Sequence, residues 1–159
     1  MPLFLRLSAS DWLDMNPAFE GESWTIADSV RLAPLLAAHG VDVLDVSSGG
    51  NHPMQKISPG PGYHVPFAKA IKRAVGDRML VGSVGSITTG RQAQAILTGE
   101  GEESDSRGPE ELDLVIVGRM FQKNPALVWS WAEELGVEIN VANQIRWGFG
   151  GRPGAPKKK

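Results

Sequence analysis

Apolar runs recur four times along the chain, and each is followed by a segment with helical spacing. The runs cover residues 3–8, 41–46, 79–84 and 114–117, and the helical segments are expected at about 26–38, 65–75, 91–97 and 125–135. The last run is continuously apolar, which is typical of a strand covered on both faces of a parallel sheet. Alternating strands and helices predict an α/β fold whose parallel sheet has right-handed crossovers.

The first helical segment carries its own boundary signals. Thr25 and Asp28 have the spacing of a capping box, and Gly40 follows the last apolar position as a C-terminal cap. Pro34 lies inside this segment, where it removes a backbone donor and is expected to bend or weaken the helix.

Four strand–helix units are half of what a closed (β/α)8 barrel of about 250 residues requires. A half barrel exposes two sheet edges and a wide apolar interior, so a sister half is expected. An open doubly wound sheet is the alternative. The glycine-rich segments follow the second, third and fourth strands rather than the first, so no dinucleotide fingerprint supports it.

Composition excludes several classes of function. The chain has 159 residues, of which 42% are hydrophobic and 21% charged, as expected for one globular core. Its net charge of -2 argues against nucleic acid as the main partner. It contains no cysteine, which excludes disulfides, cysteine-ligated zinc and a thiol nucleophile. No apolar run reaches membrane-spanning length and no signal peptide is evident, so we expect no membrane partner and a cytoplasmic location.

A candidate phosphate site follows the fourth strand. Gly118 permits a tight turn, and Arg119 places a planar guanidinium at the carboxyl end of the strand, where ligands bind in α/β proteins. The alternative is that the glycine only ends the strand and the arginine is a solvated surface charge.

Glycines after the third strand extend this candidate site. The backbone N–H groups of Gly82, Gly85 and Ser86 can point at a phosphate beside a helix start. An ordinary glycine turn is the alternative, and it is favoured more for Gly82 than for Gly85. Ser47 and Ser48 close the second strand, but they are also plain turn residues and are not counted as site residues.

The histidines give weaker signals. His39 suits a helix C-terminus, whereas His52 and His64 flank a long loop on the expected ligand side. No carboxylate lies near these two in the sequence, so no metal site is predicted. His52 is a candidate for the mouth of a substrate site.

Five ordered motifs resemble the C-terminal half of the Old Yellow Enzyme family, and more narrowly its NADPH dehydrogenase branch. The resemblance extends from Leu3 to about Phe149, so residues 1–149 are interpreted as one half-barrel domain and residues 150–159 as a flexible basic tail. The motifs are Phe4–Asp11, Asp45–Gly50, Pro61–Ala68, Val81–Ile87 and Val117–Arg119.

The resemblance implies the fifth to eighth strands of a TIM barrel that binds FMN. It places Arg6 against the pyrimidine edge of the flavin, where a cation favours the negative charge of reduced FMN. The alternative for Arg6 is an ion pair with Asp45 or Asp11. The resemblance also assigns Tyr63 to packing of its loop. The implied phosphate contacts are Gly85, Ser86, Gly118 and Arg119.

Two segments depart from the family. Residues 99–111 form an acidic insertion, expected to be a solvated loop on the face opposite the site. Trp147 stands where this branch often has an arginine that reaches a neighbouring subunit, and Arg146 precedes it.

The resulting hypothesis is the C-terminal portion of an FMN-dependent NADPH dehydrogenase or ene-reductase. Such an enzyme passes hydride from NADPH through FMN to an α,β-unsaturated carbonyl. The family's proton donor and substrate-anchoring pair fall outside this chain, so no catalytic residue is assigned and the chain alone is expected to be inactive. The alternatives are a non-catalytic half barrel that self-associates or pairs with a missing N-terminal half, and another phosphate-binding TIM barrel.

Overall fold

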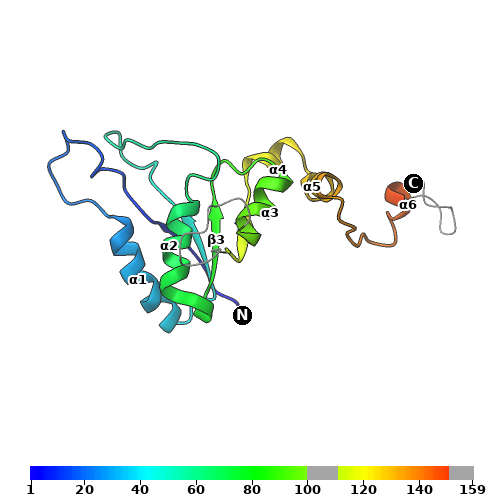
Figure 1. The fold of residues 1–159 in the computed structure, drawn as a ribbon, viewed down its shortest axis with the longest axis horizontal. Coiled ribbons are helices and arrows are strands. Elements are labelled where there is room, and N and C mark those ends of the chain that lie inside the picture. The colour runs from blue at the N-terminus through cyan, green and yellow to red at the C-terminus, as the bar shows by residue number, and fades with distance from the viewer. Residues whose placement is uncertain (100–110, 151–159) are drawn as a thin grey trace.

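A computed structural model describes residues 1–99 and 111–150 of the chain (Figure 1). The strands are β1 (Phe4–Ser8), β2 (Val43–Ser47), β3 (Leu80–Val84) and β4 (Leu114–Ile116). The helices are α1 (Ile26–Ala38), α2 (Val65–Val75), η1 (Gly76–Arg78), α3 (Gly90–Thr98), α4 (Arg119–Lys123), α5 (Leu127–Leu135) and α6 (Trp147–Gly150). The predicted basic tail after its first residue, Gly150, and nearly all of the predicted acidic insertion lie outside the described residues.

The four strands form one parallel sheet in the order β1-β2-β3-β4. One transverse row of the register runs from Arg6 through Asp45 and Gly82 to Leu114. The predicted α/β class and parallel sheet are therefore confirmed. Because all strands run the same way, their carboxyl ends meet at a single edge of the sheet, which lies at the top of Figure 1.

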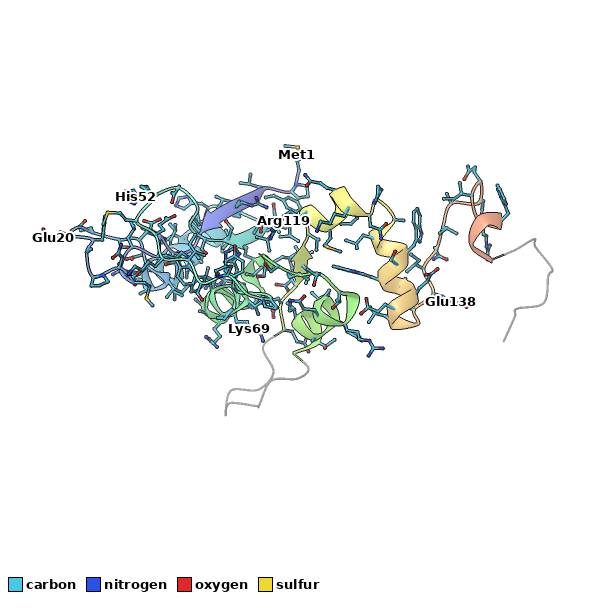
Figure 2. All side chains as sticks on the ribbon, turned by 90° about the horizontal axis from the view of Figure 1, so that it is seen from above. Met1, Glu20, His52, Lys69, Arg119 and Glu138 are labelled. Carbon is cyan, nitrogen blue, oxygen red and sulfur yellow. The ribbon has the colours of Figure 1, made fainter. Side chains whose placement is uncertain are left out.

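The hydrophobic core lies between the sheet and its helices. Leu44 and Val46 of β2 and Val81 of β3 are fully buried. They belong to one cluster with Ala33 of α1 and Ile71 of α2. Side chains alternate between the two faces of a strand, so this core uses one face of the sheet only. Figure 2 shows α2 and α3 on one side of the molecule and β1 on the other.

The opposite face of the sheet carries exposed apolar side chains. Phe4 is 69% exposed and Leu80 is 47% exposed. Parallel sheets ordinarily have both faces covered, because their strands are apolar on both sides. Within the described residues, helices cover only one face of this sheet.

Helix α1 begins and ends as the sequence predicts. The Asp28 carboxylate accepts hydrogen bonds from the Thr25 N–H (2.9 Å) and the Thr25 hydroxyl (2.7 Å), which completes the capping box. Gly40 has a φ of 87° just past the helix end, a conformation that favours glycine. The helix continues through Pro34 without interruption.

Among the described residues, the short helices η1, α4 and α6 were not predicted. The sequence suggests a single helix after the fourth strand, beginning near Pro125, whereas the structure has α4 immediately after β4 and begins α5 at Leu127. The short α4 places Arg119 in a first helical turn. No helix in residues 1–99 or 111–150 combines the length and apolar character needed to cross a membrane.

Asp113 ties the end of the sheet to α2. Its carboxylate accepts a hydrogen bond from the Val81 N–H at 2.8 Å and from Lys72 Nζ at 3.0 Å. Both charged side chains are largely buried, at 24% and 18% exposure. The pair thus joins β3, α2 and the start of β4.

Replacing Asp113 by alanine is therefore expected to destabilise the fold by about 2 kcal/mol, because it leaves the Val81 N–H without its acceptor and removes the nearer of two carboxylates beside the partly buried Lys72 ammonium. Urea unfolding measures this loss. Asp14→Ala removes an exposed carboxylate instead and is the matched control. An Asp113→Ala variant as stable as Asp14→Ala would contradict the assignment.

His64 is buried beneath the loop that follows β3. Its ring is 3% exposed, and Nδ1 lies 2.8 Å from the Val84 carbonyl oxygen, an arrangement in which Nδ1–H donates. The Tyr63 ring packs on it with a centroid distance of 3.8 Å. The expectation that His64 faces a ligand is therefore replaced by a packing role, and Tyr63 takes the packing role that the resemblance implies.

Burial lowers the pKa of His64 below its ordinary value, and the Val84 carbonyl and the Asp45 carboxylate oppose this shift only in part. The folded protein therefore holds fewer protons than the unfolded chain. Stability is retained above about pH 6.5, the unfolded pKa, and is lost as the pH falls below it.

We expect His64→Gln to flatten the decrease in unfolding free energy as the pH falls below about 6.5, where one such histidine contributes at most ~1.4 kcal/mol per pH unit. Urea titrations at several pH values provide the measurement. His39→Gln, at an exposed helix end, should keep the wild-type slope. Equal slopes for His64→Gln and the wild type would show that another group is responsible.

Candidate functional site

Two loops meet at the carboxyl edge of the sheet. One follows β3 and contains Gly85 and Ser86, and the other follows β4 and contains Gly118 and Arg119. Val84 pairs with Ile116 in the register, so the two loops leave neighbouring strands side by side. Figure 2 looks onto this edge and shows Arg119 over the strands, away from Lys69 on the helical side.

Arg119 is exposed and has no hydrogen bond or ion pair with any residue in the described ranges. It is the first residue of α4, and the N–H groups of Arg119 and Met120 have no backbone acceptor there, as is usual in a first helical turn. A Cβ atom added to Gly118 would meet no atom within 4 Å. An anion can therefore approach this backbone closely while the guanidinium closes on it.

Position 85 requires a glycine because the neighbouring side chains leave no room for a Cβ atom, and not because a ligand needs the space. It has a φ of 114°, and an added Cβ would lie 2.8 Å from His64 Nδ1 and from Tyr63 Cε1. Its carbonyl also accepts a hydrogen bond from the Gly62 N–H at 3.1 Å. Gly85 thus fixes the course of the β3 loop above the buried histidine.

Ser86 takes a conformation that residues with a side chain rarely adopt. Its φ is 51°, and Gln92 Nε2 donates to its carbonyl oxygen at 3.2 Å. The N–H groups of Gly85 and Ser86 donate to no acceptor in the described residues. Backbone held this way at the edge of a sheet is typical of ligand loops, where unpaired N–H groups form an anion-binding concavity.

Gly82 does not belong to this loop. It lies inside β3, where an added Cβ would be 2.8 Å from Ile116 Cδ1 and 3.0 Å from Leu114 Cβ. Side chains of β4 fill the space above it. Packing within the sheet therefore explains why position 82 is a glycine.

Arg6 forms the ion pair that the sequence left open as an alternative. Its Nε and terminal nitrogen both lie 2.5 Å from Asp45 Oδ2. The arginine side chain is 61% exposed, while that of Asp45 is 14% exposed. Asp11, the other possible partner, instead accepts a hydrogen bond from the Trp24 N–H at 3.1 Å.

Asp45, the partner of Arg6, has a second feature. Its Oδ1 atom is buried and has no hydrogen-bond partner in the described residues. Buried carboxylate oxygens are normally satisfied. A lone acid in an apolar strand, Val43–Ser47, was the signal that could have marked it.

The other residues considered in the sequence either pack against neighbouring side chains or lie near the end of the described chain. Ser48 Oγ accepts a hydrogen bond from Trp12 Nε1 at 2.7 Å, and the ring of exposed His52 packs edge-on against Phe19 at 5.9 Å. No group of three or more metal-ligating side chains occurs in the described residues. Trp147 is 72% exposed and follows exposed Arg146, near the end of the described chain.

Comparison with known proteins finds several relatives whose alignments cover nearly the whole of this chain. The chain is 46% identical over 156 residues, 95% of its length, to NADH:flavin oxidoreductase FG08077 of Gibberella zeae. It is 38% identical over 148 residues to the NADPH dehydrogenase of Geobacillus sp. strain WCH70, and 38% identical over 143 residues to that of Bacillus pumilus. These alignments cover 93% and 90% of the chain. No protein-family model matches.

The chain spans little more than a third of the length of these relatives, between 35% and 38%. Within that span the alignments include both loops of the candidate site. The resemblance to the Old Yellow Enzyme family noted in the sequence is therefore confirmed, because proteins named NADH:flavin oxidoreductase and NADPH dehydrogenase align with nearly the whole length of this chain.

Proposed function

We propose that this chain is the phosphate-binding half of an FMN-dependent NADPH dehydrogenase, built as four units of a TIM barrel. The observation that carries the proposal is the exposed guanidinium of Arg119, which has no partner in the described residues and stands beside the bare backbone of Gly118. The names of the relatives support a flavin and a nicotinamide as the reactants. The register of β3 and β4 supports one shared site for both loops.

The residues of the β3 and β4 loops fit a phosphate monoester. Arg119 would bind two phosphate oxygens through its planar fork, and the first N–H groups of α4 would meet a third. The unpaired N–H groups of Gly85 and Ser86 would close the other side. The proposed phosphate contact of Gly85 therefore rests on its backbone N–H group, because packing against His64 and Tyr63 already explains why the residue has no side chain.

Arg6 supplies a fixed positive charge on the uncovered side of the sheet. When bound, FMN would accept hydride from NADPH and deliver it to an α,β-unsaturated carbonyl compound. Asp45 holds the guanidinium in place through Oδ2, and the exposed part of Arg6 still has N–H groups to offer. A cation positioned in advance would favour negative charge on a neighbouring ring at no cost of reorganisation.

A second candidate function is a half barrel that associates without catalysis. The half-covered sheet favours it, because Phe4 and Leu80 expose apolar surface to solvent. The two candidates differ in ligand binding: only the first requires the β3 and β4 loops to hold a phosphate.

The phosphate assignment predicts that Arg119→Ala weakens FMN binding roughly 10- to 100-fold, the range expected for loss of one charge-assisted contact of about 1.5–3 kcal/mol. Riboflavin, which lacks the phosphate, should bind the variant and the wild type equally. Quenching of flavin fluorescence on titration measures both affinities.

Arg31→Ala is the matched control, because it removes an exposed arginine from α1, whose ion pair is with Asp28. It should leave FMN binding unchanged. Equal FMN affinity for Arg119→Ala and the wild type, or no FMN binding by the wild type, would refute the phosphate site in this chain.

We further expect the purified chain supplied with FMN to oxidise NADPH no faster than free FMN does. The physical reason is that the described residues offer only one side of a flavin site, at the β3 and β4 loops. Absorbance at the NADPH band, with an enone present, measures the rate. Turnover well above the free-flavin rate, abolished by Arg119→Ala, would show that these residues form a complete active site.

A further inference from the structure

The β3 loop is held by a side chain from the helix that follows it. Gln92 lies in the first turn of α3, and its amide contacts two residues of the loop. Nε2 donates to the Ser86 carbonyl oxygen at 3.2 Å, and Oε1 accepts a hydrogen bond from the Thr88 N–H at 2.9 Å. A carbonyl can only accept and a backbone N–H can only donate, so both contacts agree on one orientation of the amide.

The position of Gln92 is itself well defined. Its backbone N–H donates to Thr89 Oγ1 at 3.1 Å, which is the N-cap contact of α3, and the residue is half-buried. Its Nε2 lies 3.5 Å from the place that a Cβ on Gly62 would take, and the Gly62 N–H donates to the Gly85 carbonyl oxygen at 3.1 Å. The amide is therefore enclosed between the start of α3 and the loops on either side of it.

Ser86 is the residue of the loop that most needs to be held. Its φ of 51° lies in the left-handed region, which residues with a Cβ atom rarely adopt. Such a conformation persists where the surrounding contacts fix it. The hydrogen bond from Gln92 to the Ser86 carbonyl oxygen is a contact of this kind. The directions of the Gly85 and Ser86 N–H groups depend on the same backbone torsions.

The start of α3 is closed to an anion, in contrast to the loop before it. The Glu134 carboxylate of α5 accepts hydrogen bonds from the N–H groups of Gly90 at 2.8 Å and Arg91 at 3.3 Å. This carboxylate would repel a phosphate at the same place. The loop can instead offer the N–H groups of Gly85 and Ser86, which donate to no acceptor within residues 1–99 and 111–150.

We propose that Gln92 is the positioning residue of the β3 loop: by holding Ser86 in its left-handed conformation, it directs the N–H groups of Gly85 and Ser86 at a phosphate. This inference rests on the proposed phosphate site and adds to it a residue that acts through the backbone of the loop. Donors that are positioned in advance cost no reorganisation when the anion binds. Loss of Gln92 therefore weakens phosphate binding although every donor is still present.

Two variants at position 92 separate the two hydrogen bonds of the amide. Gln92→Met keeps a long, unbranched side chain with good helix propensity but can form neither bond. Gln92→Glu retains an acceptor for the Thr88 N–H, and its ionised carboxylate has no hydrogen to donate to the Ser86 carbonyl. Gln94→Ala changes an exposed glutamine of the same helix and is the matched control.

Nuclear magnetic resonance of the ¹⁵N-labelled chain, titrated with inorganic phosphate at constant pH and ionic strength, tests the proposal. In the wild type the amide signals of Gly85, Ser86 and Met120 should move together. In both position-92 variants the dissociation constant should rise roughly tenfold, about the effect of one hydrogen bond to a charged group. The signals of Gly85 and Ser86 should move less in these variants, while that of Met120 still moves. Gln94→Ala should bind phosphate as the wild type does.

A second readout needs no phosphate. A residue with positive φ gives a strong nuclear Overhauser effect between its own N–H and Hα, because the two hydrogens lie close together. This signal of Ser86 should weaken in both position-92 variants and persist in Gln94→Ala. The amide signals of the other residues report whether each variant is folded.

Unchanged phosphate affinity in both position-92 variants would overturn the role of Gln92 and leave the proposed phosphate site intact. Weaker binding with an unchanged Ser86 signal would also overturn it, because Gln92 would then not act through this backbone. A wild type in which Met120 responds but Gly85 and Ser86 do not would do the same. A wild type that responds at neither loop would refute the phosphate site itself, and the role of Gln92 with it.

Discussion

Successive side chains of a strand point to opposite faces of the sheet, and this alternation determines where the core of this molecule forms. Leu44, Val46 and Val81 point toward the helices and form a dry core, and the same geometry sends Arg6 and Asp45 to the other side of the sheet. Helices cannot cover both faces when every crossover returns on one side. The core, the exposed apolar residues and the position of the Arg6–Asp45 ion pair all follow from this arrangement.

The same constraint sets where ligand chemistry can occur. Parallel strands bring their carboxyl ends to one edge, so loops that are distant in the sequence leave the sheet side by side. The β3 loop is held rigidly, since Gly62, His64 and Tyr63 all contact Gly85. The β4 loop is open, with an exposed arginine at the start of a short helix. A well-packed loop beside an accessible arginine is a suitable arrangement for binding a phosphate.

Much of the fold could be predicted from the sequence because its elements are short and strongly patterned. Helix α1 has its capping box and its terminal glycine, and α2 also begins and ends where the apolar spacing indicates. Helix α4 was missed, since five residues are too few to show a period. The burial of His64 was also missed, because a histidine beside a loop gives no sign of whether it packs inward.

The candidate site was predictable only in part, for a physical reason. A glycine in a sequence does not show whether a neighbouring atom excludes a side chain, or which atom does so. At Gly85 the neighbours are His64 and Tyr63, at Gly82 they are the side chains of β4, and at Gly118 there are none within reach. Three glycines that look alike in the sequence thus have three different surroundings.

Gly82 has a consequence for how this sequence can change over time. The volume missing at position 82 is occupied by Leu114 and Ile116, so the three positions share one fixed amount of space across two strands. A larger residue at 82 clashes with β4 unless a smaller residue has first appeared there, and that smaller residue leaves a cavity until position 82 is filled. The order of substitutions, and not only their identity, therefore decides which descendants of this chain still fold.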